Sequence, residues 1–118
     1  MRGPIPHLAR RQEFLKVAAT RRKWAAPGLV LQLLVREDAS GPRVGYTASK
    51  KVGNSVARNR ARRRLRAAVA AVAAGRVRDD VDFVVIAREA TVDRPWTALL
   101  ADLDQALARV NALKAIPC

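Results

Sequence analysis

Hydrophobic residues recur with the spacing of β-strands in three stretches of the chain. Residues 29–35 and 81–87 are short runs of mainly Leu, Val and Ile, which predict two well-buried strands. Residues 43–49 alternate between two kinds of side chain, which predicts a strand with two unlike faces. Because only a short loop separates residues 29–35 from residues 43–49, we expect these two strands to pair antiparallel. The strand at 81–87 follows a helical segment and is expected to lie parallel to a neighbour.

Three further stretches have the spacing of α-helices. Residues 8–19 predict a short helix, and a longer one is predicted to begin at Asn54 or Ser55, run to about residue 74 and end at Gly75. A third helix is expected to open at Pro95 and to cover a sheet with one apolar stripe. This stripe consists of Trp96, Leu99, Leu100, Leu103, Leu107 and Val110 and ends with Lys114.

Together these elements predict a single domain over residues 1–118 with an α/β (α+β) sandwich fold, in which helices pack on a small mixed sheet of about four strands. The Pro-rich residues 1–7 predict a disordered leader. The only cysteine, Cys118, is the last residue, which excludes an internal disulfide and predicts a frayed terminal thiol. The chain has neither a long apolar run nor a signal-peptide region, so we expect a cytoplasmic protein.

The long central helix combines an apolar face with a dense positive charge. Six of the nine residues 58–66 are arginine. The apolar stripe is formed by Ala61, Leu65, Ala68, Val69 and Val72. Asn59, Arg63 and Arg66 are predicted to lie opposite this stripe, and Arg58 and Arg62 to border it. The pattern therefore indicates a folded helix with a cationic side.

The positive charge requires an anionic partner. The net charge is +13, and residues 41–78 contain eleven bases and no acid. A solvated helix face usually mixes acids with bases for mutual support, so the missing anions are expected to come from a partner. Arginine forks match phosphate oxygens, which favours a nucleic acid. An anionic membrane surface is the alternative, although the small Ala and Val side chains of this helix disfavour it.

The sequence offers little for catalysis by the protein itself. Its carboxylates are scattered, its one histidine is His7, and no glycine-rich phosphate loop is present. Asp79, Asp80 and Asp82 suggest Mg²⁺ ligands, but neighbouring residues of an extended chain point in opposite directions, which favours a solvated loop. Folding could still bring Asp38 near Asp82.

Phe14 is the one large aromatic residue of the first predicted helix. In a chain with few aromatic residues it is expected to belong to the core. The alternative is that its ring lines a cleft and stacks on a base, since every base has a π-face.

Residues 49–66, SKKVGNSVARNRARRRLR, resemble the RNR signature of the bacterial ribonuclease P protein component. The flanking segments RRQEFLKVAAT, RVGYTASKK and DFVVIAR stand in the order of that family, so the resemblance covers roughly residues 8–113. It implies a fold similar to domain 2 of ribosomal protein S5, with a left-handed βαβ crossover around the basic helix. Generic chain packing would have favoured the right-handed form.

The resemblance also implies a function. Members of the family are protein subunits of ribonuclease P, an endonuclease that hydrolyses precursor transfer RNA to release its 5′ leader. The protein binds the catalytic RNA and the leader, and the RNA holds the Mg²⁺ and performs the catalysis. We therefore expect no catalytic residue, metal or cofactor in the protein, and a monomer within the holoenzyme.

The site residues follow by position in the family's motifs. The residues expected to bind the catalytic RNA are Lys50, Lys51, Asn54, Arg58, Asn59, Arg60 and Arg63. Those expected to line a central cleft for the leader are Phe14, Val17, Gln32, Thr47, Arg62 and Arg66. Many members have aromatic residues where this chain has Ala18 and Gln32, so stacking should depend more on Phe14. A ribosomal or ribosome-assembly RNA-binding protein is the main alternative, and a single-strand-binding module is another.

Overall fold

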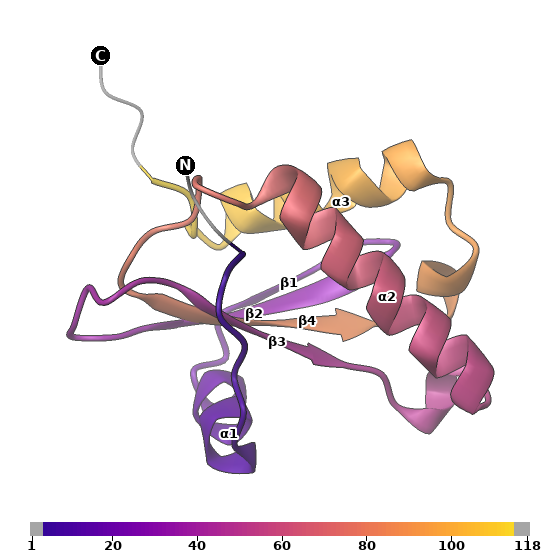
Figure 1. The fold of residues 1–118 in the computed structure, drawn as a ribbon, viewed down its shortest axis with the longest axis horizontal. Coiled ribbons are helices and arrows are strands. Elements are labelled where there is room, and N and C mark those ends of the chain that lie inside the picture. Colours follow the sequence, from indigo (N-terminus) through magenta and orange to yellow (C-terminus); the bar gives the residue numbers. More distant parts are fainter. Residues whose placement is uncertain (1–3, 115–118) are drawn as a thin grey trace.

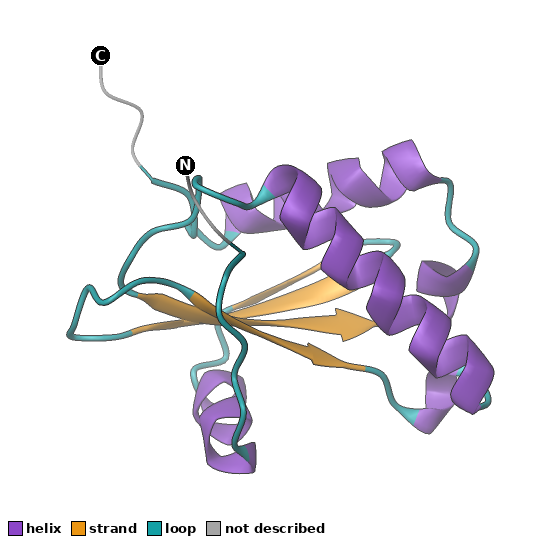
Figure 2. Ribbon diagram, viewed as in Figure 1, coloured by secondary structure: helices purple, strands orange, loops and turns teal. Residues whose placement is uncertain are grey.

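The computed structural model describes residues 4–114, and Cys118 lies outside them. Helices and strands are distributed along the chain as Figure 2 shows. The elements are α1 (Arg11–Ala19), β1 (Lys23–Ala25), β2 (Leu29–Val35), β3 (Arg43–Thr47), η1 (Lys50–Val52), α2 (Ser55–Val72), β4 (Val81–Ala87), η2 (Glu89–Val92) and α3 (Trp96–Arg109). The three predicted strands and three predicted helices are therefore present, with shifts of a few residues at their ends.

The four strands form one mixed sheet in the order β1-β2-β4-β3. β4 runs parallel to β3, as predicted, and antiparallel to β2. The prediction that residues 29–35 and 43–49 pair with each other is wrong, because β4 lies between them. β4 is the most buried strand, with six of its seven residues buried, which suits a central position. The seven residues between β2 and β3 can extend over roughly 23 Å, more than the ~10 Å across one intervening strand.

β1 is an additional short strand that periodicity did not predict. Its three residues pair antiparallel with β2, with Trp24 opposite Leu31. Three residues are too few to show a period of two, so the sequence pattern did not reveal this strand. The sheet thus reaches the predicted number of about four strands.

The helices cover the two faces of the sheet unequally. α2 and α3 lie together on one face, and the short α1 lies on the other (Figure 1). Between the sheet and α2 and α3 is the main core, to which α2 contributes Ala61, Leu65, Ala68 and Val69. The stripe predicted for this helix is therefore confirmed, with Val72 half-buried at its end. α1 covers its face through a smaller cluster of Leu8, Val17 and Val84.

A capping side chain determines where α2 begins, and glycines with positive φ lie near both of its ends. The Oδ1 atom of Asn54 accepts a hydrogen bond from the Ala57 N–H at 2.9 Å, which satisfies one of the free amides of the first turn. Gly53 just before it has φ 142°, a conformation that side chains disfavour. The helix ends at Val72, two residues earlier than predicted, and Gly75 follows with φ 77°.

The predicted stripe of α3 needs two corrections. Leu99, Leu103, Leu107 and Val110 are buried as expected, but Trp96 is 40% exposed, with its ring centroid 5.9 Å from the Arg64 guanidinium. The helix ends at Arg109, and the positive φ of Asn111 breaks it before Lys114. None of the helices within residues 4–114 is long and apolar enough to cross a membrane.

Residues 4–7 are not the disordered leader that was predicted over residues 1–7, and residues 1–3 lie outside the described part of the chain. Residues 4–8 lie along β3, where the Val44 N–H donates to Pro6 O at 2.9 Å and the Leu8 N–H donates to Val44 O at 2.8 Å. This segment covers the free edge of β3, whose backbone groups otherwise lack partners in the sheet. α1 accordingly begins at Arg11 and not at Leu8.

Candidate nucleic-acid interface

The arginines of α2 differ in their surroundings, and some of them are bonded to other parts of the protein. Arg64 donates to the carbonyls of Thr91 and Arg94, and Arg60 donates to Val92 O at 3.0 Å. These two arginines therefore join α2 to the segment around η2. Arg63 is exposed on the outer side of the helix, as the helical wheel predicted.

The residues predicted to bind catalytic RNA lie along η1 and the first half of α2, with Arg58 half-buried and the others exposed. Lys50 and Lys51 are exposed on η1, where Ser49 Oγ accepts the Lys51 N–H at 3.3 Å. They are followed by Asn54, Arg58, Asn59, Arg60 and Arg63. We call the two lysines and these five residues together the basic strip. Asn54 is committed to capping the helix, and Arg60 retains an exposed side chain despite its bond to Val92.

The residues predicted for the leader cleft divide between two sides of the sheet. Phe14, Val17, Gln32 and Thr47 lie on the face that α1 covers. Arg66 lies on the other side, with its guanidinium 5.9 Å from the ring centroid of Tyr46. Arg62 is half-buried on the same helix and donates to Asn59 Oδ1 at 2.9 Å. The structure therefore does not bring Arg66 next to Phe14.

On the face of α1 the side chains stand in rows across the strands. Gln32, Val84 and Gly45 form one row, and Val30, Ile86 and Thr47 form the next. The Phe14 ring lies over Gly45, so close that a Cβ there would stand 2.3 Å from Phe14 Cε1. The second row is half-buried. We call Phe14, Gln32, Thr47 and Ile86 the open sheet surface.

Val17 differs from its predicted role. Its side chain is fully buried between α1 and the sheet, so it offers no surface for a ligand and instead anchors the helix. Phe14 was expected either in the core or lining a cleft, and it is half-buried. Part of its ring packs on the sheet and part remains accessible.

Substituting Gly45 by Ala is expected to displace Phe14 and to lower the free energy of unfolding by about 1–3 kcal/mol, because the added methyl group overlaps the ring. Urea unfolding measures this loss. The control is Gly41→Ala, whose Cβ would meet nothing within 4 Å but whose positive φ carries its own strain. A Gly45→Ala protein as stable as the wild type would contradict the position of the ring.

A network of charges holds α1 against the sheet. It also shows that the prediction of a solvated loop for Asp79, Asp80 and Asp82 is wrong for Asp82. Asp82 belongs to β4 and is buried, where it accepts two hydrogen bonds from Arg43, from Nε at 2.9 Å and Nη2 at 2.8 Å. Arg43 Nη1 donates to Glu13 Oε2 of α1 at 2.6 Å. The pKa of Glu13 is lowered chiefly by the backbone amides of Arg10 and Ala9, with a further contribution from Arg43. The network holds α1, and with it Phe14, against the sheet.

Asp38 also comes near Asp82, as the sequence allowed, through a shared cation. Arg36 lies 3.3 Å from Asp82 Oδ1 and 3.6 Å from Asp38 Oδ1. Because arginine neutralises both carboxylates, the pair is a structural ion cluster. Within residues 4–114 no group of three or more His, Cys, Asp or Glu side chains is placed to hold a metal ion.

A hollow of about 700 Å³ continues the open sheet surface toward the basic strip. Ser49, Lys51, Ile86, Arg88 and Glu89 contribute to its walls. Arg88, which the sequence analysis did not select, donates to Ala26 O at 2.7 Å at the end of β4. Its position at the end of the segment DFVVIAR was the one signal in the sequence. Ile86 and Lys51 thus connect the two surfaces.

Comparisons with known proteins identify the family and the fold of this chain. The family model described as Ribonuclease P matches residues 6–111. The ribonuclease P protein component of Paramagnetospirillum magneticum is 53% identical over 97% of this chain and 89% of the relative, and that of Gluconacetobacter diazotrophicus is 50% identical over 88% and 90%. The ribonuclease P protein of Staphylococcus aureus has a TM-score of 0.77 at 21% identity, covering 92% of this chain and 97% of that one.

A second solved structure, the ribonuclease P protein of Thermotoga maritima, has a TM-score of 0.69 at 21% identity and covers 82% of this chain and 90% of that one. Both structures share the α+β fold of three helices and a four-stranded mixed sheet, which confirms the predicted fold class. The family match spans nearly the whole described chain. The chain belongs to the ribonuclease P protein family.

Proposed function

We propose that this chain is the protein subunit of a ribonuclease P, and that it binds the catalytic RNA and the 5′ leader of precursor transfer RNA. The observation that carries the proposal is the continuity between the basic strip and the open sheet surface, which meet at the hollow lined by Lys51 and Ile86. One surface suits the phosphates of a folded RNA, and the other suits an unpaired strand. One small protein would thus contact both RNAs at once.

The basic strip is suited to the catalytic RNA. Lys50, Lys51, Arg60 and Arg63 are exposed and Arg58 is half-buried. The sequence has no acid between residues 41 and 78, and Arg60 lies 4.0 Å from the exposed Asp93. Neutralising closely spaced phosphates releases counterions and lowers the ionic strength that a folded RNA requires. The chemistry of cleavage is assigned to Mg²⁺ held by the RNA, and the protein supplies affinity and position.

The open sheet surface is suited to the leader. Phe14 offers a ring for stacking, while Gln32 and Thr47 offer hydrogen-bonding groups on either side of β4. Holding the leader here would fix the orientation of the adjoining scissile phosphate relative to the RNA-bound metal, which lowers the entropic part of the barrier. In this proposal the protein acts as a monomer within the holoenzyme.

The test is a cleavage assay with a bacterial ribonuclease P RNA and a precursor transfer RNA at low Mg²⁺. Addition of the protein is expected to increase the rate of 5′ cleavage, and absence of any stimulation would reject the proposal. RNA that copurifies with the protein provides a second readout. Ribosomal RNA in place of one structured RNA would favour a ribosome-assembly protein.

Two adjacent arginines of α2 should behave differently in binding to the catalytic RNA. Arg63→Ala is expected to weaken binding and to reduce the slope of log K against log salt by about one, since it removes one phosphate contact. Arg64→Ala removes a side chain that points inward to the carbonyls of Thr91 and Arg94. It should lower stability and leave the slope unchanged. Filter binding across a salt series compares them, and equal slopes for Arg63→Ala and wild type would contradict the assignment.

A further inference from the structure

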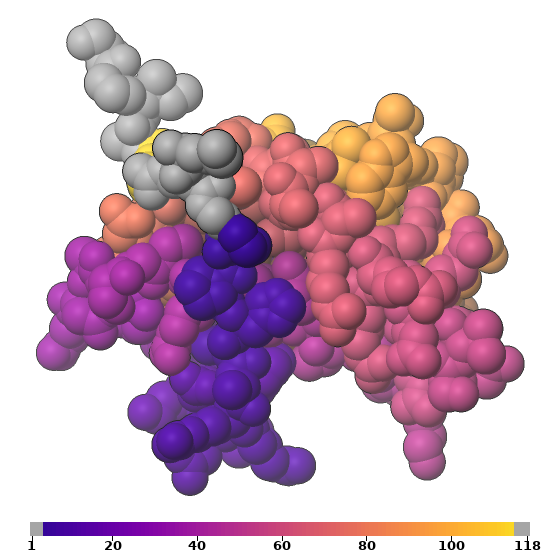
Figure 3. Space-filling view, in the orientation of Figure 1, coloured from indigo at the N-terminus to yellow at the C-terminus, as the bar shows by residue number. Residues whose placement is uncertain are grey.

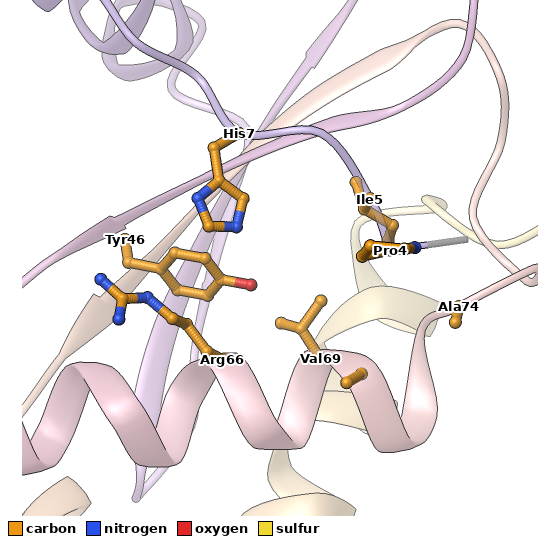
Figure 4. Close-up of a pocket in the computed structure, with 8 residues that line it drawn as sticks. Pro4, Ile5, His7, Tyr46, Arg66, Val69 and Ala74 are labelled. Carbon is orange, nitrogen blue, oxygen red and sulfur yellow. The ribbon is translucent and has the colours of Figure 1, made fainter.

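A second hollow, of about 410 Å³, lies between the N-terminal segment and α2. His7, Tyr46 and Arg66 line one side, and Ile5, Val69 and Ala70 contribute apolar surface (Figure 4). Figure 3 shows the N-terminal segment, in indigo, lying on the molecular surface beside α2. Tyr46 projects from β3 toward α2, and therefore away from the face of the sheet that carries Phe14. This hollow is distinct from the open sheet surface.

The two aromatic rings of the hollow are held in a fixed arrangement. The ring centroids of His7 and Tyr46 are 5.4 Å apart, with an angle of 73° between the ring planes. The backbone at His7 is held by the hydrogen bonds of its two neighbours, Pro6 and Leu8, to Val44 of β3, while its ring is exposed. Tyr46 is fixed by its position in the same strand. An incoming ring would therefore meet two aromatic rings whose backbones are held in one sheet.

The polar groups of the hollow are suited to a nucleotide. Among the described residues that line it, Arg66 is the only charged side chain, and none of them is an acid that would repel a phosphate. Figure 4 shows the Tyr46 hydroxyl directed toward the space above Val69. The Tyr46 hydroxyl is protonated at neutral pH and can donate a hydrogen bond, and burial raises its pKa further, to about 12. The volume is within the range of small-ligand sites, roughly 300–1,000 Å³.

We propose that this hollow binds one unpaired purine nucleotide of the RNA that lies along α2, with the base against His7, Tyr46 and the apolar wall and the phosphate on Arg66. A purine provides the larger ring area for this wall. The proposal rests on the proposed function, which supplies the RNA. It also accounts for Arg66, which the structure separates from Phe14.

The test uses NMR of the whole chain with adenosine 5′-monophosphate as the probe. The chain has one histidine and one tyrosine, and both line the hollow, so their ring signals report on this site alone. Saturable shifts of both signals are expected. Ribose 5-phosphate lacks the base and is expected to bind at least about fivefold more weakly, since stacking contributes roughly 1–3 kcal/mol per base. Equal binding of the two probes would show an adventitious anion site only and overturn the proposal.

Variants separate this site from general attraction to a basic protein. His7→Ala removes an exposed ring, and it is expected to weaken binding of adenosine 5′-monophosphate at least about fivefold, measured on the Tyr46 signals. Trp96→Ala removes an exposed ring that does not line the hollow and should leave the affinity unchanged. Equal losses in both variants, or no loss for His7→Ala, would overturn the proposal.

The cleavage assay distinguishes failure of this inference from failure of the proposed function. If the nucleotide does not bind but the protein still stimulates ribonuclease P RNA, the hollow is not a nucleotide site and the proposed function stands. If the protein neither stimulates cleavage nor binds the catalytic RNA, the proposed function itself fails. His7→Ala is also expected to weaken assembly with the catalytic RNA without changing the preference for leader-bearing substrate, which depends on the open sheet surface.

Discussion

Phe14→Ala is expected to weaken binding of leader-bearing precursor transfer RNA to the holoenzyme by about 1–3 kcal/mol, roughly 5- to 150-fold, and to leave binding of mature transfer RNA unchanged. The ring is half-buried over Gly45 and stands one row of side chains from Thr47 and Ile86. Residue 18 is Ala and residue 32 is Gln, so within the described residues Phe14 is the ring on this face that could stack on a base. Equilibrium binding of both transfer RNAs measures the difference.

Leu15→Ala is the matched control for this substitution. Leu15 is the next residue of α1 and is 54% exposed, so its truncation changes the helix sequence without removing the ring over the sheet. It should bind both transfer RNAs like the wild type. Phe14→Leu keeps an apolar side chain over Gly45 but cannot stack on a base. It should therefore preserve the free energy of unfolding and still weaken binding of leader-bearing precursor transfer RNA. Equal losses for precursor and mature transfer RNA would make Phe14 a core residue only.

Asp82→Ala is expected to lower the free energy of unfolding by about 3–5 kcal/mol, because it leaves buried cations without their counter-charge. The Asp82 side chain is 3% exposed and lies within 3.3 Å of Arg36, whose own side chain is 11% exposed. It also holds Arg43 through two hydrogen bonds. A domain of this size has a total stability of only about 5–15 kcal/mol, so the loss should be visible directly in urea unfolding.

Asp80→Ala provides the comparison, since it removes a carboxylate two residues earlier. Asp80 pairs with Arg78 at 2.9 Å, but both side chains are about one-third exposed, and surface pairs contribute roughly 0–1 kcal/mol. The two variants should therefore differ by at least about 2 kcal/mol. Similar midpoints for both would mean that Asp82 is solvated in the folded protein, as the sequence had suggested.

The Asp82→Ala substitution should also disturb the open sheet surface, because Asp82 helps to hold α1. Arg43 joins Asp82 to Glu13 of α1, and the same helix carries Phe14. α1 is otherwise held by a small cluster around Leu8 and Val17 and by Thr20, whose hydroxyl donates to Leu33 O at 2.7 Å. A helix with so few contacts depends strongly on each of them. We therefore expect Asp82→Ala to reduce the preference for leader-bearing substrate as well.

The elements of secondary structure and the basic strip were predictable from the sequence because both depend on neighbours along the chain. Helical spacing identified the face of α2 that carries Leu65, and the absence of acids identified its cationic side. The Asn54 cap follows from a residue type and its position. The family resemblance added the RNA partners and the residues expected to contact them, which composition and spacing alone would not provide.

Only the tertiary structure decided how these parts meet. The placement of β4 between β2 and β3, the burial of Asp82 and the docking of residues 4–8 on β3 each depend on residues distant in sequence. The same is true of the candidate site, where the sheet separates Arg66 from Phe14 and brings Arg66 to Tyr46 and His7 instead. Periodicity specifies which face of an element is buried, but not which partner buries it, because that choice depends on how all the elements fill one core.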